Sequence, residues 1–276
     1  MKNIIIPVDF SKYSEYALKV GAQFAKKHNT KLTLVHMLEM PTGYSDHSVD
    51  QKTTVFMLKL AEKKFDEFID KDYLEDVSVD LVIKHYALFP EIGVLAKELN
   101  ADLIIMGSHG VSEHDDFFLG SNTEKVVKTS KIPVLVIKKE IDSIDFDKVV
   151  YVSDFKTESV EAYQKAKTFF NLIKVKPKLL FINKADGGFV STKEMETRFQ
   201  NFLQKADGNL DNLSYFDNYD DYTVLDGVKY YVEKNNISLV SIATHGKSSI
   251  SKFFNHSVSL EIANHLETPV LTLLIS

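Results

Sequence analysis

Residues 103–110 read LIIMGSHG, and residues 120–123, which follow after a nine-residue spacer, read GSNT. The apolar run at the start is typical of a buried parallel strand. Residues 121–129 have the composition of a helix, and Ser121 and Glu124 have the spacing of a capping box that would begin it. The predicted order is therefore a strand, a loop punctuated by glycines, and the N-terminus of a helix.

This order suits an anion, because free backbone N–H groups and the positive end of the helix dipole would point at one spot beyond the strand. Glycines in the loop would let a phosphate approach the backbone without meeting a Cβ atom. The alternative interpretation is that these glycines serve only tight turns.

At this stretch the chain resembles the universal stress protein family. Its nucleotide-binding members carry Gly, two residues, Gly, nine residues, Gly, and then Ser or Thr; Gly107, Gly110, Gly120 and Ser121 fit that spacing. The resemblance implies an α/β fold of the Rossmann-like, adenine nucleotide α-hydrolase-like kind. It also implies a cytoplasmic stress-response protein that binds an adenine nucleotide.

Strand and helix patterns alternate along the first half of the chain, which favours a parallel sheet wrapped by helices. Apolar runs predict strands over 3–8, 31–38, 77–86, 103–107 and 133–137. Helical spacing predicts helices over 13–27, with Ser11 as N-cap, and over 50–72, 91–99 and 121–129. Ligands of such sheets lie beyond the carboxyl ends of strands where the strand order reverses, and Asp9 and Gly107 would both face that crevice if their strands are neighbours.

The second half repeats the first. Asp154-Phe155 follows Asp9-Phe10 by 145 residues, and the run 240–246 follows 104–110 by 136. The matching elements are helix 158–173, strand 178–183, helix 192–206, strand 213–216 and helix 222–235. We predict two tandem domains, 1–138 and 147–276, each a five-stranded parallel sheet with helices on both faces, joined by a linker over 138–147. The resemblance implies that they pair through their last strands as a pseudo-dimer within one chain; a further homodimer and protein partners stay open.

In the second copy the motif has lost two of its three glycines, since Ala243 and His256 stand where Gly107 and Gly120 stand in the first. Ala243 adds a Cβ at the end of the strand, and His256 places an imidazole where the helix should meet a phosphate. We therefore predict that the first domain binds the nucleotide and that the second has lost tight binding.

Carrying the family's contacts over residue by residue assigns a role to each matching position. Pro7, Val8 and Asp9 would flank the nucleoside, and Met37 and Met106 would line the base pocket. Gly107, His109 and Gly110 would offer backbone groups to the ribose and phosphate, and Gly120, Ser121, Asn122 and Thr123 would cap the phosphates. A turn or capping role for Asp9, and a structural role for His109, which recurs as His245, are the alternatives.

The nine-residue spacer departs from the family, because it carries Glu113, Asp115 and Asp116 and no Lys or Arg. These carboxylates would repel a triphosphate unless Mg²⁺ lay between them, or they would point away as a solvated loop. The cofactor is therefore expected to be ATP or another adenine nucleotide, ADP or AMP, with Mg²⁺ as an open addition. No other metal site is indicated by the spacing of the histidines.

Composition excludes several classes of protein. A net charge of −6 disfavours a nucleic-acid-binding surface, and the absence of cysteine excludes disulfides and thiolate catalysis. No apolar run is long enough for a membrane span, and no signal peptide is recognisable, so we expect a cytoplasmic protein. Nucleophile-elbow, Walker and dinucleotide motifs are absent. We expect a regulator or sensor rather than an enzyme; a nucleotide-independent scaffold and slow ATP hydrolysis through Asp9 or His109 are the alternatives.

Overall fold

The computed structural model describes residues 1–38, 51–85, 91–109, 119–185, 188–245 and 256–275. The first half contains β1 (Asn3–Pro7), α1 (Lys12–His28), β2 (Lys31–Leu38), α2 (Gln51–Ile69), η1 (Asp72–Leu74), β3 (Val79–His85), α3 (Ile92–Glu98), β4 (Leu103–Gly107), α4 (Ser121–Thr129) and β5 (Val134–Ile137). The second contains β6 (Val149–Val152), η3 (Thr157–Ser159), α5 (Val160–Leu172), β7 (Lys178–Lys184), α6 (Thr192–Asp207), η4 (Leu213–Tyr215), β8 (Phe216–Asp221), α7 (Val224–Asn235), β9 (Leu239–His245), α8 (His256–His265) and β10 (Val270–Ile275).

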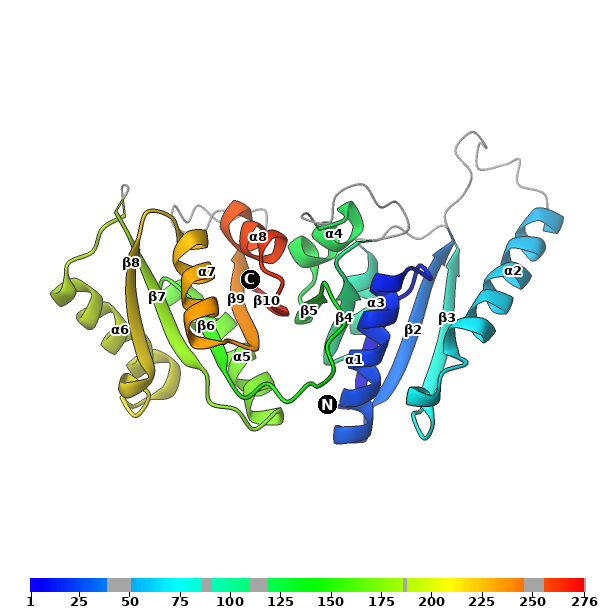
Figure 1. The fold of residues 1–276 in the computed structure, drawn as a ribbon, viewed down its shortest axis with the longest axis horizontal. Helices are drawn as coiled ribbons and strands as arrows, with labels where there is room; N and C mark the ends of the chain where they lie inside the picture. Colours follow the sequence, from blue (N-terminus) through cyan, green and yellow to red (C-terminus); the bar gives the residue numbers. More distant parts are fainter. Residues whose placement is uncertain (39–50, 86–90, 110–118, 186–187, 246–255, 276) are drawn as a thin grey trace.

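The strands form one ten-stranded sheet in the order β3-β2-β1-β4-β5-β10-β9-β6-β7-β8. All neighbours are parallel except β5 and β10, which run antiparallel in the middle and pair Leu135 with Leu271. Figure 1 shows the two halves side by side with this pair between them. The predicted α/β class and five-stranded parallel halves are confirmed, and the two sheets merge through their last strands within one chain.

Each half buries an apolar layer on both faces of the sheet. In β1, Ile4 and Ile6 point into the core under α1, α2, α5 and α6, whereas Ile5 belongs to the core under α3, α4, α7 and α8. This alternation is what a strand buried on both faces requires, because successive side chains point to opposite faces. The near-continuous apolar runs of the sequence are thereby explained.

Backbone conformation supports the internal repeat. Phe10 and Phe155 both have a positive φ, of 65° and 50°, and Asn29 and Lys174 share the same feature at 50° and 57°. Both pairs are separated by 145 residues, so α1 and α5 align without a gap. Each Phe folds its ring into a cluster of aromatic residues below the turn.

Several local predictions were wrong. Residues 213–215 form the short helix η4, and the strand β8 follows at Phe216–Asp221 instead of 213–216. This strand is the outer edge of the sheet, and the carboxylates of its sequence FDNYDD discourage pairing with a strand of another chain. A sequence this polar resembles that of a loop, which is why the strand was misplaced. The predicted capping box at Ser121 is also absent: Gly120 is the N-cap of α4, and no side chain caps it.

The segment predicted as a linker is packed against the first half. Phe146 is 3% exposed and its ring lies 6.4 Å from that of Phe24, centroid to centroid. The backbone N–H of Ile144 donates to Gln23 Oε1 at 2.9 Å, and Asp145 pairs with Lys27. The connection between the halves is therefore a structured part of the core.

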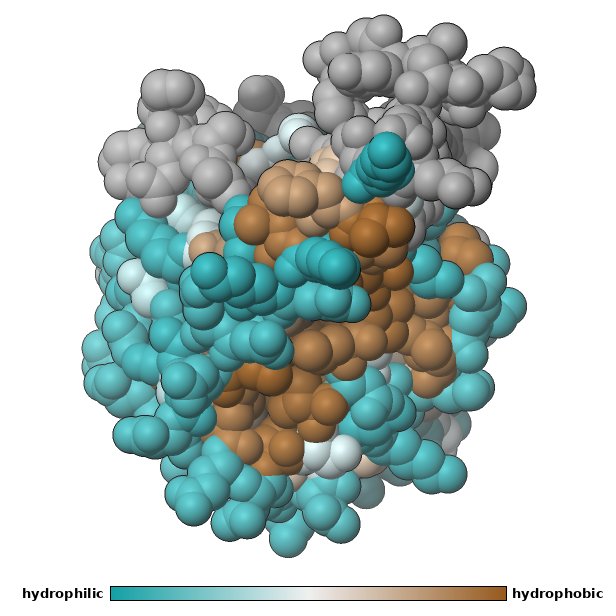
Figure 2. Space-filling view, turned by 90° about the vertical axis from the view of Figure 1, so that its right-hand side faces the viewer, coloured by the Kyte–Doolittle hydropathy of each residue, from teal (hydrophilic) through white to brown (hydrophobic). Residues whose placement is uncertain are grey.

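The outer face of the first half carries exposed apolar side chains. Figure 2 shows this face, on which Val55, Phe56 and Leu60 of α2 and Leu81 of β3 are between 42% and 66% exposed. Apolar side chains gathered in this way are typical of a contact surface, whereas single ones are common on any protein.

Candidate functional site

The candidate crevice lies where the strand order reverses between β1 and β4. These strands are parallel neighbours, with Ile5 opposite Ile104, so continuing the register places Asp9 level with Ser108. The condition on which the sequence prediction depended, that the two strands be adjacent, is therefore met. Ligands of open α/β sheets bind beyond the carboxyl ends of the strands at such a point.

Asp9 forms the turn that leads from β1 into α1. Its Oδ1 accepts hydrogen bonds from the backbone N–H of Ser11 at 3.0 Å and from the Ser11 hydroxyl at 2.7 Å. Ser11 in turn caps α1 by accepting from the N–H of Ser14, as predicted. The carboxylate thus has the turn role that was the alternative interpretation, while the residue stays partly exposed to solvent.

Gly107 is a glycine because a helix crosses directly over it. A Cβ atom at this position would lie 2.6 Å from the backbone carbonyl of Tyr13 on α1. The hydroxyl of Thr123, which is 3% exposed, donates to the Gly107 carbonyl at 2.9 Å and ties α4 to the end of β4. Two motif positions therefore have structural roles of their own.

The N-terminus of α4 adjoins the end of β4. Gly120 donates its N–H to the Ser108 carbonyl at 2.7 Å, and its own carbonyl receives the first helical bond, from Glu124. The N–H groups of the first helical turn, at Ser121, Asn122 and Thr123, have no intrahelical acceptor, because they precede that bond. In the described residues no side chain caps them.

His109 is held in place from two sides. Its Nδ1 lies 2.8 Å from the Ser108 hydroxyl, and its ring is 5.0 Å from the ring of Tyr13, centroid to centroid. On the other side of β1, His36 Nδ1 lies 2.7 Å from the Val8 carbonyl. The contacts with Ser108 and Tyr13 orient the imidazole of His109, which agrees with a structural role.

The apolar residues assigned to the site are buried. Pro7 is the last residue of β1, and Val8 after it is 3% exposed. Met37 and Met106 are 5% and 4% exposed, and both belong to the apolar cluster that contains Leu119. Gly110, which the sequence assigns to the site, lies outside the described residues, as do positions 111–118 with the three spacer carboxylates. Among the described residues no cluster of three His, Asp or Glu side chains could hold a metal ion.

One element of the site was not foreseen in the sequence. Asn264 of α8, in the second half, accepts a 2.8 Å hydrogen bond through Oδ1 from the backbone N–H of Leu119. Its backbone carbonyl accepts from the ammonium group of Lys138. Burial lowers the pKa of Lys138 to about 8. A single Asn inside a helix carries no motif, so no signal in the sequence could have identified it.

The residue that corresponds to Asp9 in the second half, Asp154, is buried. Asp154 is only 1% exposed, and its Oδ1 accepts from the Lys156 N–H and the Ser159 hydroxyl, while its carboxylate pairs with the Lys156 ammonium at 3.4 Å. Ala243 takes the position of Gly107, and the segment aligned with the start of α1 is here the 3₁₀ turn η3. Asp154 is therefore enclosed where Asp9 is partly exposed.

Comparisons with known proteins agree with this architecture. The universal stress protein family matches residues 1–138. A Staphylococcus saprophyticus relative, itself assigned to that family only provisionally, is 31% identical over 165 residues, which cover 57% of this chain and 95% of the relative. Among solved structures, a universal stress protein from Archaeoglobus fulgidus superposes with a TM-score of 0.72 at 19% identity, over 99% of this chain and 98% of that one.

A Pseudomonas aeruginosa protein described as functionally unknown also shares the fold, with a TM-score of 0.65 at 15% identity, over 100% of this chain and 93% of that one. Among the described residues no helix is long and apolar enough to cross a membrane. The full-length structural likeness shows the fold, and the family match over half of the chain shows that this chain belongs to the universal stress protein family.

Proposed function

We propose that this stress-response protein binds an adenine nucleotide, ATP, ADP or AMP, in the crevice between β1 and β4 of its first half. The observation that carries the proposal is the start of α4, which no side chain of the described residues caps and which Thr123 ties to the end of β4, beside the partly exposed Asp9 after β1. Three N–H groups and the positive helix end attract a phosphate. The burial of its counterpart Asp154 in the second half supports one site per chain.

The role proposed is that of a cytoplasmic sensor or regulator rather than of an enzyme. Asp9 is engaged in the turn to Ser11, and His109 contacts Ser108 and Tyr13, so both candidates for slow ATP hydrolysis have structural tasks. A regulator needs only that nucleotide binding change the stability or shape of the loop after β4. Mg²⁺ would accompany a triphosphate as its counterion.

The test begins with the mass of any small molecule released from the gently denatured protein, followed by melting curves with ATP, ADP and AMP. Ligand at 100 times its Kd stabilises a folded protein by about 2.7 kcal/mol.

Ser121→Glu places a negative charge on the exposed first residue of α4. The new carboxylate interacts favourably with the positive end of the helix dipole but repels a phosphate. We expect this variant to fold normally and to lose the nucleotide-dependent shift.

Ser257→Glu is the matched control, because Ser257 has the position of Ser121 in the second copy. It should leave the shift unchanged. An unaltered shift in Ser121→Glu, or two equal sites per chain, would contradict the proposed site.

The second candidate function is a nucleotide-independent scaffold that acts through protein partners. The exposed apolar side chains of α2 and β3 favour it, with Phe56 being 66% exposed. Gly107 and Thr123 also have structural tasks that need no ligand. A scaffold would show no released nucleotide and no melting shift with any of the three nucleotides. Its partner binding would then be lost in Phe56→Lys.

A further inference from the structure

The strand β3 lies at one edge of the sheet. Among the described strands its single neighbour is β2. The backbone N–H of Leu32 on β2 donates to the Ser78 carbonyl at 2.9 Å, and the parallel register places Leu32 opposite Val79. In such a ladder alternate residues bond to the neighbouring strand, so the backbone N–H and carbonyl groups of Leu81 and Ile83 point to the outer edge. An edge of this kind is a template for pairing with another strand.

An apolar surface accompanies this edge on the face that α2 covers. Val79 and Ile83 pack against the core under α2, so Leu81, which lies between them, points to the same face. Leu81 is 42% exposed there. Figure 2 looks onto this end of the molecule and shows apolar atoms forming a continuous area over it. On α2 the exposed apolar side chains are those of Val55, Phe56 and Leu60.

The second half shows that the fold does not require this surface. In the repeat, α6 has the position of α2, and β8 has the position of β3 at the other edge of the sheet. Within Thr192–Asp207, which the structure describes in full, no large apolar side chain is exposed. The edge strand β8 carries the carboxylates of Asp217, Asp220 and Asp221, which would repel a second β8 strand.

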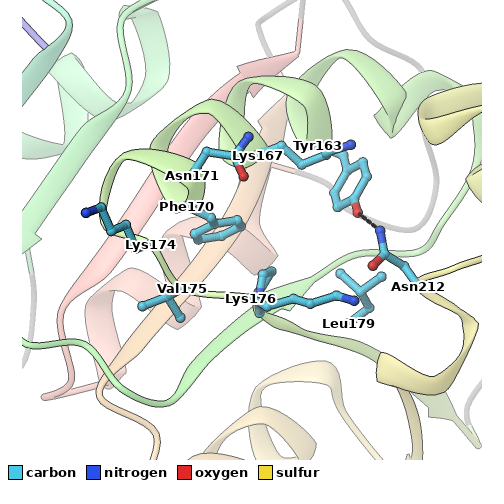
Figure 3. A pocket seen from close by; sticks show the side chains of 10 residues that line it. Tyr163, Lys167, Phe170, Asn171, Lys174, Val175, Lys176, Leu179 and Asn212 are labelled. Carbon is cyan, nitrogen blue, oxygen red and sulfur yellow. Dashed lines mark hydrogen bonds between the residues drawn. The ribbon is translucent and has the colours of Figure 1, made fainter.

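Polar groups near the start of β8 are engaged with one another. Figure 3 shows the amide of Asn212, in the turn before η4, beside the hydroxyl of Tyr163 on α5, and the amide donates to this hydroxyl at 3.4 Å. Lys167 of the same helix pairs with Asp207 at 2.6 Å. These groups are satisfied within the chain, whereas the exposed apolar surface lies at the opposite end of the sheet.

The charges of β3 suit antiparallel pairing of this strand with a second copy of itself. Asp80 and Lys84 lie two residues on either side of Val82, on the face opposite Leu81. If two β3 strands run antiparallel about Val82, Asp80 of each copy is directly opposite Lys84 of the other. Leu81 is then opposite Ile83 on the face that α2 covers. Opposite charges across a pair of strands stabilise the pairing, and moving the centre to a neighbouring residue would remove both charge pairs.

Pairing at this edge would bring the two α2 helices together. The ring of Phe65 on α2 lies 6.0 Å from that of His36 on β2, centroid to centroid, and Val79 of β3 packs on the same core, so α2 covers both outer strands. Neighbouring strands are about 4.8 Å apart, so helices that each cover two strands would lie about 10 Å apart across the seam. Packed helices have this separation. The exposed side chains of Phe56 and Leu60 would thereby gain an apolar neighbour.

We propose that two copies of this chain associate through β3, paired antiparallel about Val82, with their α2 helices side by side. Backbone hydrogen bonds join the sheets, the apolar side chains of α2 and Leu81 supply the buried area, and the two charge pairs set the register. Asp80 keeps its 2.6 Å contact with Lys31 through Oδ2, and its Oδ1 accepts from Lys84 of the partner subunit. The same surface serves both copies, so association ends at the dimer.

The dimer would repeat a device that the chain already uses. Its two halves join their sheets through the antiparallel pair β5 and β10, in which Leu135 lies opposite Leu271. The proposed pair joins two chains in the same way at the outer strand. It is formed by the edge of the sheet and not by the crevice between β1 and β4, so it does not depend on nucleotide binding.

Sedimentation velocity of the full chain, from about 1 to 100 µM, measures the association. We expect the mass to rise from that of one chain to that of two, and the amides of Leu81 and Ile83 to exchange hydrogen more slowly in the dimer. Lys84→Glu places a carboxylate opposite Asp80, and Asp80→Lys places an ammonium opposite Lys84. Each variant alone should dimerise at least about tenfold more weakly, because both charge pairs become repulsive.

Mixing these two variants tests the register and the partner together. In a mixed dimer each altered residue is opposite a charge of the other sign, so association should return to near the natural strength. Lys193→Glu is the control for the charge change, on an exposed lysine of α6, and should dimerise like the natural chain. Asp80→Lys also removes the contact with Lys31, but both side chains are exposed, so the variant should fold.

Phe56→Lys tests the helix contact. It should weaken dimerisation about tenfold, whereas Phe189→Lys, at a side chain that is 71% exposed in the second half, should not. Melting curves of each variant at low concentration establish that it is folded. A natural chain that stays monomeric at about 100 µM would overturn the proposal. So would a dimer that neither charge variant weakens, or a mixture that associates no better than its two components.

Discussion

The backbone N–H of Leu119 donates a 2.8 Å hydrogen bond to Oδ1 of Asn264, although the two residues belong to different halves of the chain. Leu119 immediately precedes Gly120, the N-cap of α4, so a helix of the second half holds the backbone that leads into α4. The second half thus helps to hold the candidate site, even though Asp154, its own counterpart of Asp9, is buried.

Replacing Asn264 by Ala should loosen the loop that ends at Leu119. One neutral hydrogen bond contributes about 1 kcal/mol, so the Leu119 amide should exchange its hydrogen about fivefold faster. Hydrogen exchange followed by NMR measures this directly, and nucleotide affinity should fall by a similar factor. Asn264→Asp keeps the acceptor and should retain slow exchange. Equal exchange rates in Asn264→Ala and the natural chain would show that the bond does not hold the loop.

Gly107→Ala should destabilise the protein whether or not a nucleotide binds. The new Cβ would lie 2.6 Å from the Tyr13 carbonyl, and backbone atoms there cannot give way cheaply. We expect a loss of about 1–3 kcal/mol in the free energy of unfolding, measured with urea. The reverse change in the other copy, Ala243→Gly, should cost no more than about 1 kcal/mol, as glycine does in a strand. A neutral Gly107→Ala would remove the packing explanation for this glycine.

The alternation of strands and helices was predictable because each strand is buried on both faces and therefore appears as an apolar run. The strand 31–38 and the helix 121–129 match β2 and α4 in the structure. The β8 strand was misplaced, since an exposed edge strand needs few apolar residues. Ser121 was predicted as the N-cap of α4 but is its first helical residue, and Gly120 is the N-cap. The sequence contains nothing that distinguishes these two positions for Ser121.

For the candidate site, sequence patterns identified the strand ends but not the contacts across them. Asp9 and Gly107 lie at the carboxyl ends of neighbouring strands, which is the condition the sequence prediction set. The hydrogen bond from Leu119 to Asn264 depends on the antiparallel pairing of β5 with β10, which brings α8 beside α4. Such a contact depends on the relative placement of two repeats, and neither repeat encodes it alone.

Phe146→Ala should show that the segment between the halves is part of the core. Its ring is 3% exposed and packs near Phe24, so truncation should cost about 3–5 kcal/mol. The neighbouring ion pair between Lys27 and Asp145 is exposed, and Lys27→Ala should change stability by less than about 1 kcal/mol. Urea unfolding curves of the two variants provide the comparison. Similar small losses in both would mean that the segment is only loosely attached.

Lys138 should make the stability of the protein depend on pH in the alkaline range. Its ammonium is partly buried, and this desolvation lowers its pKa to about 8 from an ordinary value near 10.5. Between these two values the unfolded chain binds more protons than the folded one, so the free energy of unfolding rises with pH. Below pH 8 both states are protonated, and the burial penalty is constant.

The measurement is the difference in unfolding free energy between the natural chain and Lys138→Met, at intervals from pH 7 to pH 10.5. Because other groups titrate in both proteins, their contributions cancel, and the difference should rise in favour of the natural chain by up to about 3 kcal/mol. Neutral Lys138 can still donate to the Asn264 carbonyl, so the contact between the halves survives deprotonation. Lys125→Met, on an exposed position of α4, should give a difference that stays constant. A flat difference for Lys138→Met as well would mean that its amine is solvated in the folded protein.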